Sequence, residues 1–313
     1  MKRLSAIITL LAAIAAMTPS VRGERIVVYG VQTIYDMTYA VQNNSPLKLD
    51  IAWPEKGGPY PIIVYFHGGG WATGDKLLFR HRMRMMAQSG YVVFNANYRL
   101  TTNESFPAQV NDVMGAVIFA KEKAHIYNGD PERVAVMGDS SGAHLASMVA
   151  LAWDDPYFQP SYKGDGIWTA EVQAGVFMYG GYRLERAYKE NYRLWGAIIT
   201  RPLIVAFVGG TPEQMPKEYE KASPASYLGR DDIPPFFIMC GTEDSVYPES
   251  IWLHETLEER GIEHTAFFVD GEEHEFNYLE ARTDFPYLRA ILDFLDRNLK
   301  EVKPLKTADK SHD

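Results

Sequence analysis

Ser140 is the residue of this 313-residue chain whose surroundings most clearly predict chemistry. It lies at the centre of Gly138-Asp-Ser-Ser-Gly142, between an apolar run that is typical of a strand and an Ala-, Leu- and Met-rich run that is typical of a helix. A Gly-x-Ser-x-Gly at such a junction predicts a nucleophile elbow, in which a tight turn exposes the serine hydroxyl at the end of a sheet. The glycines suit this turn because a Cβ at either position would clash with the facing strand or helix. The bare pentapeptide also occurs by chance, so the serine's partners have to be found elsewhere in the chain.

A serine nucleophile needs a base to take its proton and an acid to orient that base. In this architecture both partners follow the serine in the sequence, the acid first and the histidine last. His274 fits this order, because it lies in the loop directly after the last predicted strand. Six other histidines are less well placed: His67 and His81 precede the serine, His144 and His254 lie inside predicted helices, His264 opens the last strand, and His312 lies in the tail.

The acid should follow the preceding strand, which predicts Glu243 or Asp244 after the run Phe236-Phe-Ile-Met-Cys-Gly241. We favour Asp244, because the strand ends at Gly241 and Asp244 is then the better-placed bend residue. Its carboxylate would accept the imidazole N–H and stabilise the imidazolium that forms. Asp270 is the alternative, although it lies close in sequence to His274.

Negative charge that develops on the substrate oxygen requires N–H donors that are fixed in advance. Ser141 supplies one such backbone N–H, next to the nucleophile at the start of the helix. The run His67-Gly-Gly-Gly70 follows a buried strand and precedes the elbow, and its glycines allow the backbone to bring further N–H groups close to a substrate. We expect His67 to brace this loop rather than to act as a second base.

Other chemistries find little support in the sequence. It contains no His-Glu-x-x-His zinc motif, no Walker loop and no Gly-x-Gly-x-x-Gly after a strand, so neither a metal nor an organic cofactor is predicted. The net charge is −9 and the Lys and Arg residues are scattered, which argues against nucleic acid as a partner. With 46% hydrophobic and 23% charged residues, the composition is that of a globular enzyme rather than a disordered chain.

The N-terminus has the layout of a secretory signal peptide over residues 1–23. Met1-Lys-Arg3 is basic, Leu4 to Met17 is apolar, and small, turn-prone residues follow. The apolar run is too short for a comfortable membrane span, so we expect a secreted or periplasmic protein without stable membrane anchoring; an uncleaved anchor is the alternative. Cys240 is the single cysteine, so it cannot form an internal disulfide, and we expect it to pack as a small hydrophobic residue.

Strand-like and helix-like runs alternate along the chain and would position these residues. Strand character is found at 26–40, 47–53, 61–66, 91–97, 134–137, 172–178, 236–239 and 265–269. Helices are expected at 76–89, at 107–124, from the elbow to 152, at 248–260 and at 286–299. This alternation predicts an α/β fold with a mostly parallel sheet of about eight strands and helices on both faces. Residues 24–313 are expected to form a single catalytic domain.

One segment, at about residues 180–232, interrupts the alternation, because it is far longer than a plain crossover between two strands requires. We interpret it as a cap-like insertion over the catalytic end of the sheet. It carries the aromatic residues Tyr182, Tyr188, Tyr192, Trp195 and Phe207. These either line the substrate site or pack as an additional structural core.

In combination these motifs resemble the α/β-hydrolase esterases of the hormone-sensitive-lipase-like group, and they are most similar to the bacterial acetyl and feruloyl carbohydrate-ester esterases. The similarity extends from about Val27 to Leu299. The matching pieces are His67-Gly-Gly-Gly-Trp-Ala-Thr-Gly-Asp75, Asn97-Tyr-Arg-Leu100, Phe106-Pro107, Gly138-Asp-Ser-Ser-Gly-Ala-His-Leu145, Ser223-Pro224, Gly241-Thr-Glu-Asp244 and His274.

The resemblance implies a catalytic triad of Ser140, Asp244 and His274. It also implies an oxyanion hole formed by the N–H groups of Gly69, Gly70 and Ser141. The substrate-binding candidates are Trp71 and Tyr179. Three positions depart from the pattern and concern the subfamily: Asn97 stands where such esterases often have Asp, and Ser141 and Ala143 replace the commoner Ala and Gly.

We therefore expect an exported carboxylic-ester hydrolase that acts on short-chain or carbohydrate-linked acetyl or feruloyl esters. The alternatives are an amidase, lactonase or peptidase with the same triad, or a catalytically inactive binding protein on this fold. For the enzyme, activity should fall as the pH drops through roughly 6–7, because a histidine base must be neutral.

Overall fold

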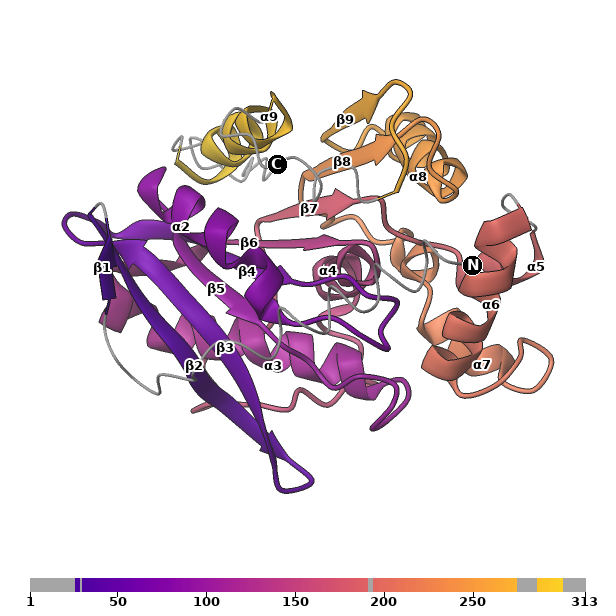
Figure 1. Ribbon diagram of the computed structural model, residues 1–313, viewed down its shortest axis with the longest axis horizontal. Coiled ribbons are helices and arrows are strands. Elements are labelled where there is room, and N and C mark those ends of the chain that lie inside the picture. Colours follow the sequence, from indigo (N-terminus) through magenta and orange to yellow (C-terminus); the bar gives the residue numbers. More distant parts are fainter. Residues whose placement is uncertain (1–25, 29, 191–193, 275–285, 301–313) are drawn as a thin grey trace, which may run out of the picture.

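A computed structural model describes residues 26–28, 30–190, 194–274 and 286–300 (Figure 1). Within these residues nine strands form one mixed sheet in the order β1-β2-β3-β5-β4-β6-β7-β8-β9. The strands are β1 Ile26–Val28, β2 Val31–Gln42, β3 Ser45–Pro54, β4 Tyr60–Phe66, β5 Val92–Ala96, β6 Gly129–Asp139, β7 Ala174–Met178, β8 Phe236–Gly241 and β9 His264–Val269. The expected signal peptide at residues 1–23 lies outside the described residues.

The sheet is antiparallel at one edge and parallel through the rest. β1, β2 and β3 pair in antiparallel fashion, and β3 pairs with β5 in the same sense. From β5 to β9 every pairing is parallel, with β4 between β5 and β6. The predicted α/β architecture with a mostly parallel sheet is confirmed. The predicted strand at 26–40 is in fact two, because the chain reverses at Gly30, whose φ of 76° a glycine adopts readily.

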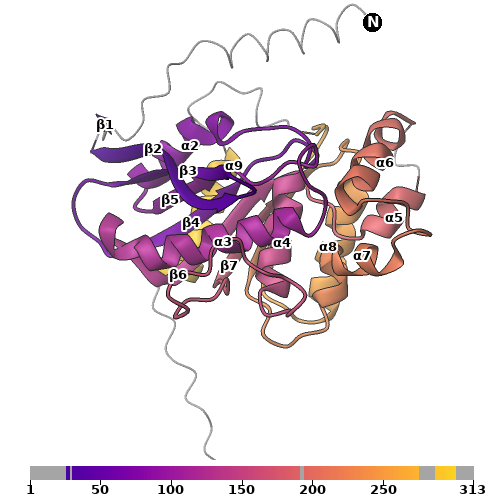
Figure 2. The ribbon, with the colours of Figure 1, turned by 90° about the horizontal axis from the view of Figure 1, so that it is seen from below.

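Helices cover both faces of the sheet (Figures 1 and 2). They are α2 Arg80–Gln88, α3 Ala108–Lys123, α4 Ser141–Ala152, α5 Leu184–Lys189, α6 Leu194–Val208, α7 Pro216–Lys221, α8 Tyr247–Glu259 and α9 Pro286–Leu295. Among the helices of the described residues, none is long and apolar enough to cross a bilayer.

The central strand β4 divides the core between the two faces. Ile62, Val64 and Phe66 belong to the cluster that includes side chains of α3, α4 and α8. Ile63 and Tyr65 belong to a second cluster with side chains of α2 and α9. All five are fully buried, as expected for a parallel strand whose alternating side chains face helices on both sides.

The inserted segment, residues 180–232, contains α5, α6, α7 and a 3₁₀ turn at Pro224–Tyr227. Figure 1 shows these helices gathered at the edge of the molecule toward which β6 and β7 point. Of the aromatic residues predicted to be either wall or core, Tyr182 and Phe207 are fully buried and pack in the core. The side chains of residues 191–199, which include Tyr192 and Trp195, lie outside the described residues.

Candidate active site

The turn that carries Ser140 joins β6 to α4. Ser140 has φ 50° and ψ −118°, a left-handed conformation that a non-glycine residue adopts only under constraint. An added Cβ on Gly138 would overlap the backbone of Gly142, and one on Gly142 would overlap the carbonyl oxygen of Phe66. The N–H of Ser140 donates to the carbonyl of Met178 at 2.9 Å. The elbow is therefore packed against β4 and hydrogen-bonded to the end of β7.

The imidazole of His274 lies between Ser140 and Asp244. Its Nε2 is 3.0 Å from Ser140 Oγ, and its Nδ1 is 2.7 Å from Asp244 Oδ2. Because the ionised carboxylate can only accept, Nδ1 carries the proton and Nε2 is left to accept from the serine hydroxyl. The Asp244 side chain is 0% exposed, whereas that of His274 is 34% exposed, so the imidazole but not the carboxylate is open to solvent. This arrangement can move the serine proton to Nε2.

Two further groups complete the surroundings of Asp244. Its Oδ1 accepts the N–H of Val246 at 2.9 Å, and the thiol of Cys240 lies 3.5 Å from Oδ2. Burial and the neighbouring carboxylate raise the pKa of this thiol, so Cys240 stays protonated inside the core. The other acids considered lie elsewhere: Asp270 accepts from the hydroxyl of Thr242 at 3.2 Å, and Glu243 is exposed.

The glycine loop that follows β4 lies beside the elbow. Gly69 and Gly70 have φ of 118° and 60°, and both line the same cavity as Ser140 and Ser141. The carbonyl of Gly69 accepts the N–H of Thr73 at 3.0 Å, and a Cβ on Gly69 would overlap the Thr73 carbonyl. Gly69 therefore stands in a tight turn that a residue with a side chain could not form. The loop brings two candidate oxyanion donors, Gly69 and Gly70, to the cavity that Ser141 of α4 also lines.

Asp139, directly before Ser140, holds this loop in place. Its buried carboxylate accepts the N–H of Gly68 at 3.1 Å and the hydroxyl of Tyr65. His67 is also buried, and its Nδ1 donates to the carbonyl of Gly68 at 2.7 Å. Burial lowers the pKa of His67, so its imidazole stays neutral and braces the loop. Sequence reasoning missed Asp139, because its partners are more than 70 residues away in the chain.

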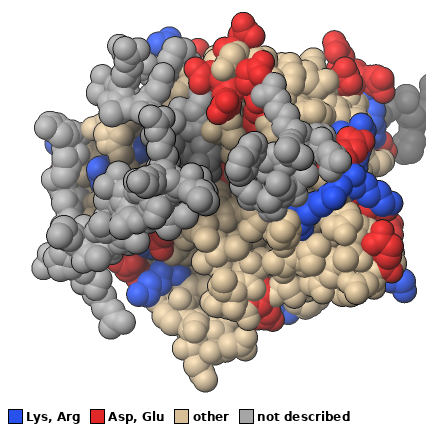
Figure 3. Space-filling model, turned by 45° about the vertical axis from the view of Figure 1, so that its right-hand side comes forward, with Lys and Arg blue, Asp and Glu red and all other residues tan. Residues whose placement is uncertain are grey.

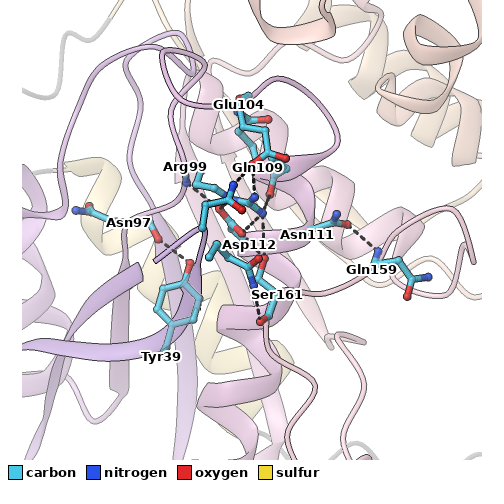
Figure 4. Close-up of polar contacts among 12 residues, drawn as sticks. Tyr39, Asn97, Arg99, Glu104, Gln109, Asn111, Asp112, Gln159 and Ser161 are labelled. Carbon is cyan, nitrogen blue, oxygen red and sulfur yellow. Dashed lines mark hydrogen bonds and ion pairs between the residues drawn. The ribbon is translucent and has the colours of Figure 1, made fainter. Parts of the chain in front are cut away.

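A second support reaches the loop through the segment that contains Tyr98 and Arg99. The Tyr98 hydroxyl donates to the carbonyl of His67 at 2.8 Å. Arg99 forms a bidentate pair with the buried Asp112, with Nε–Oδ2 at 2.8 Å and Nη2–Oδ1 at 2.7 Å (Figure 4). Asp112 also accepts the hydroxyl of Ser161, so this buried carboxylate is well paired. The motif at 97–100 therefore fixes the position of the glycine loop.

A cavity of about 740 Å³ opens onto Ser140 and His274. The inserted segment supplies its aliphatic wall, which consists of Leu184, Ala187, Leu203 and Ile204. Sequence reasoning considered only the aromatic residues of this segment, and it missed these aliphatic ones because nothing in the sequence separates a wall residue from a core residue on an apolar helix. Glu243 and Glu273, both exposed, contribute carboxylates to the lining.

Trp71 and Tyr179 also line this cavity, although both are largely buried, at 7% and 1% exposure. The Tyr179 ring stands edge-on to the imidazole of His274, with the ring centroids 4.9 Å apart. The indole of Trp71 stacks on Phe207 at 4.5 Å. Their role in substrate binding stays a prediction, and both are placed to hold the residues that surround Ser140.

Charge on the surface is mixed. On the face that Figure 3 presents, the described Lys and Arg residues form small groups beside Asp and Glu residues.

Comparison with known proteins assigns the chain to a family. The sequence matches the BD-FAE family over residues 49–257. It is 33% identical over 193 residues to LipM, a probable carboxylic ester hydrolase of Mycobacterium tuberculosis. The aligned residues cover 61% of this chain and 43% of LipM. It is 26% identical over 261 residues to the esterase LipC of the same organism, which covers 81% of this chain and 63% of that protein. The chain thus spans less than two thirds of the length of these relatives.

Solved structures agree on the fold. Esterase B of Lactobacillus Rhamnosis superimposes with a TM-score of 0.73 at 19% identity, over 95% of both chains. Esterase 2 of Thermogutta terrifontis superimposes with a TM-score of 0.67 at 24% identity, over 85% of this chain and 93% of that one. These similarities confirm the α/β-hydrolase fold. Since the family match takes in about two thirds of the sequence, from β3 to α8, the chain belongs to the BD-FAE family of α/β-hydrolases, within the hormone-sensitive-lipase-like group.

Proposed function

We propose that this chain hydrolyses carboxylic esters through an acyl-enzyme formed on Ser140. The observation that carries the proposal is the hydrogen-bonded series from Ser140 Oγ through His274 to Asp244, at the edge of an accessible cavity. In the first step Oγ attacks the ester carbonyl carbon while Nε2 of His274 takes the hydroxyl proton. The carboxylate of Asp244 stabilises the imidazolium that results.

The oxyanion of the tetrahedral intermediate would accept hydrogen bonds from the N–H groups of Gly69, Gly70 and Ser141. The N-terminus of α4 favours negative charge at the same place. As the intermediate collapses, His274 returns its proton to the leaving alcohol, and the acyl group stays on Ser140. Water then attacks the acyl-enzyme with His274 again as the base, which releases the carboxylic acid and restores the serine.

The relatives support ester chemistry, because LipM and LipC carry the names of a probable carboxylic ester hydrolase and an esterase. For the substrate we propose short-chain or carbohydrate-linked esters, such as acetyl or feruloyl esters. A cavity of about 740 Å³ is in the range that binds small organic ligands, its aliphatic wall suits an acyl group, and its carboxylates can accept hydrogen bonds from sugar hydroxyls. The mixed surface charge gives no support to a nucleic-acid substrate.

We also propose that the protein is exported and not stably anchored in a membrane, on the signal-peptide layout of residues 1–23. Residues 24–313 would then form one catalytic domain, with the inserted segment at 180–232. Comparing the N-terminal residue of the mature protein with Met1 tests the export proposal: an N-terminus at Met1 in protein recovered from the producing cells would contradict it.

A fluorophosphonate probe tests the nucleophile directly. It should form one covalent adduct on Ser140, and Ser140→Ala should abolish both labelling and turnover. Ser147→Ala is the matched control, because Ser147 is a buried serine of the same helix whose hydroxyl is bonded to the carbonyl of His144. No adduct on correctly folded protein would favour a binding protein on this fold.

A substrate panel separates the esterase from the related hydrolases. Nitrophenyl esters of increasing acyl length would be compared with nitroanilides, lactones and acetylated or feruloylated sugars. We expect the highest kcat/KM for esters. A preference for anilides or lactones would contradict the esterase proposal while leaving the triad in place.

A further inference from the structure

His144 stands in α4, one turn after the nucleophile, and is fully buried. Its Nδ1 is 3.2 Å from Nε1 of Trp71, the residue that directly follows the glycine loop. Its Nε2 is 2.8 Å from the carbonyl oxygen of Ala222 in the inserted segment. One side chain therefore joins the nucleophile helix, the glycine loop and the inserted segment.

The partners of His144 fix which ring nitrogen carries the proton. An indole N–H can only donate and a carbonyl oxygen can only accept, so Nδ1 must be bare and Nε2 protonated. A second proton on Nδ1 would place two N–H groups against each other. Burial lowers the pKa of His144 to about 4, so this single neutral form persists at neutral pH. His144 is therefore a neutral bridge that both donates and accepts a hydrogen bond.

Trp71 is a residue whose backbone needs such support. Its φ is 60°, in the left-handed region that a bulky side chain rarely adopts, and the neighbouring Gly70 has the same φ. Such strain persists only where the surroundings over-determine it. Three contacts do so here: the indole N–H to His144, the stack on Phe207, and the Trp71 carbonyl, which accepts the N–H of Thr101 at 2.9 Å.

We propose that His144 is a positioning residue: by holding Trp71 it fixes the N–H groups of Gly69 and Gly70 where the oxyanion forms. The bond to Ala222 ties the inserted segment, which supplies the cavity wall, to the same point. This inference rests on the proposed function, because it concerns the same site. A displaced oxyanion donor weakens binding of the transition state more than that of the substrate, so the loss should fall on kcat rather than KM.

Two substitutions of His144 separate its two bonds. In His144→Gln the longer amide can reach the position of Nε2 and keep the bond to Ala222, but it leaves the indole N–H without its acceptor. In His144→Asn the shorter amide can place its oxygen where Nδ1 was and keep the bond to Trp71. Trp71→Phe removes only the indole N–H donor and retains a ring that can stack on Phe207. His254→Gln is the control for loss of an imidazole elsewhere, since His254 of α8 is bonded to His264 at the start of β9 and neither residue lines the cavity.

We expect H144Q and W71F each to lower kcat about tenfold, with KM within about twofold of wild type, because each misplaces a donor whose complete loss costs about 10²–10³ in rate. The double variant should be no worse than either single one, because both remove the same bond. H144N should recover at least about a third of wild-type kcat, and H254Q should leave kcat unchanged. A fully active H144Q or W71F, or losses of kcat that multiply in the double variant, would overturn the positioning role of His144.

Failure of the proposed function can be told apart from failure of the positioning role of His144. Wild-type protein that neither turns over esters nor reacts with the fluorophosphonate refutes the proposed function. The hydrogen bond between His144 and Trp71 is then judged without substrate, from the free energies of unfolding of H144Q, W71F and the double variant, and from ¹⁵N NMR of the imidazole. Unfolding effects that are non-additive, with a bare Nδ1 at pH 6, support it; additive effects or a protonated Nδ1 overturn it.

Discussion

Under the proposed ester hydrolysis, Leu203→Ala should extend the range of acyl groups that the cavity accepts. Leu203 stands on α6, and its Cδ1, Cδ2 and Cγ lie 2.6, 3.3 and 3.4 Å from where a Cβ on Gly70 would be, so its isobutyl group covers the glycine loop inside the cavity. Its removal leaves room for about two further methylenes of an acyl chain. Each buried methylene contributes about 0.8 kcal/mol, so two give about 1.6 kcal/mol, or about a 15-fold gain in kcat/KM.

The assay is kcat/KM for nitrophenyl esters from acetate to octanoate, expressed relative to acetate for each variant. Leu228→Ala is the matched control, because Leu228 is a buried leucine of the inserted segment that does not line the cavity. Both variants lose a leucine and should unfold at lower temperature, but only Leu203→Ala should change the chain-length profile. An unchanged profile in folded Leu203→Ala protein that still reacts with a fluorophosphonate would refute the assignment of α6 as the acyl wall.

Three further outcomes follow from the contacts. Gly142→Ala should lower the free energy of unfolding by about 4 kcal/mol or more, because the added Cβ would overlap the carbonyl oxygen of Phe66 on the central strand. A Tm equal to that of wild type would contradict this. Asn97→Asp would replace the amide that donates to Asp75 at 2.7 Å with a second carboxylate. The repulsion would raise a carboxyl pKa in the folded state. The free energy of unfolding, measured with urea, should therefore match that of wild type near pH 4 and fall below it as the pH rises, by about 2 kcal/mol at pH 8. A difference from wild type that does not change with pH would argue against it. His144 has a folded-state pKa of about 4, below its unfolded value, so the unfolded chain binds the proton first and wild-type stability should fall by up to about 3 kcal/mol from pH 6.5 to pH 4. His144→Asn should lose this share of the slope in the same unfolding series, and an unaltered slope would contradict the buried neutral imidazole.

The elements and their order could be predicted from the sequence because each carries a local signal. The buried strand at 61–66 is a continuous apolar run, and the glycines at 138 and 142 mark a turn that only glycine permits. The proximity of His274 and Asp244 to Ser140 could be predicted as well, because chain order and strand ends restrict where such side chains can lie. The structure places Ser140, His274 and Asp244 in one hydrogen-bonded series, as that order requires.

The supporting contacts could not be predicted, because they depend on distances across the fold. Asp139 and Gly68 are 71 residues apart, and His144 and Ala222 are 78 residues apart, yet each pair is hydrogen-bonded. A histidine inside an apolar helix looks like an ordinary core residue from sequence alone. Leu203 is likewise one apolar residue among many on α6, and only its place over Gly70 identifies it as cavity wall.

The site is built on backbone strain that neighbouring strands and loops hold in place. Trp71, Ser140 and Tyr179 all have positive φ, and they follow β4, β6 and β7 at the same edge of the sheet. The N–H of Ser140 donates to Met178 at the end of β7, and that of Tyr179 donates to Met239 of β8 at 2.6 Å, so parallel pairing continues one residue into the turns at Ser140 and Tyr179. Trp71 is held instead through its carbonyl, which accepts the N–H of Thr101. Glycine would relieve the strain but would remove the hydroxyl, the indole and the phenol that define the site, and it would add conformational freedom to the unfolded chain. The sheet therefore does more than carry the loops, because its hydrogen-bond ladder offsets the cost of presenting side chains where the backbone alone would favour glycine.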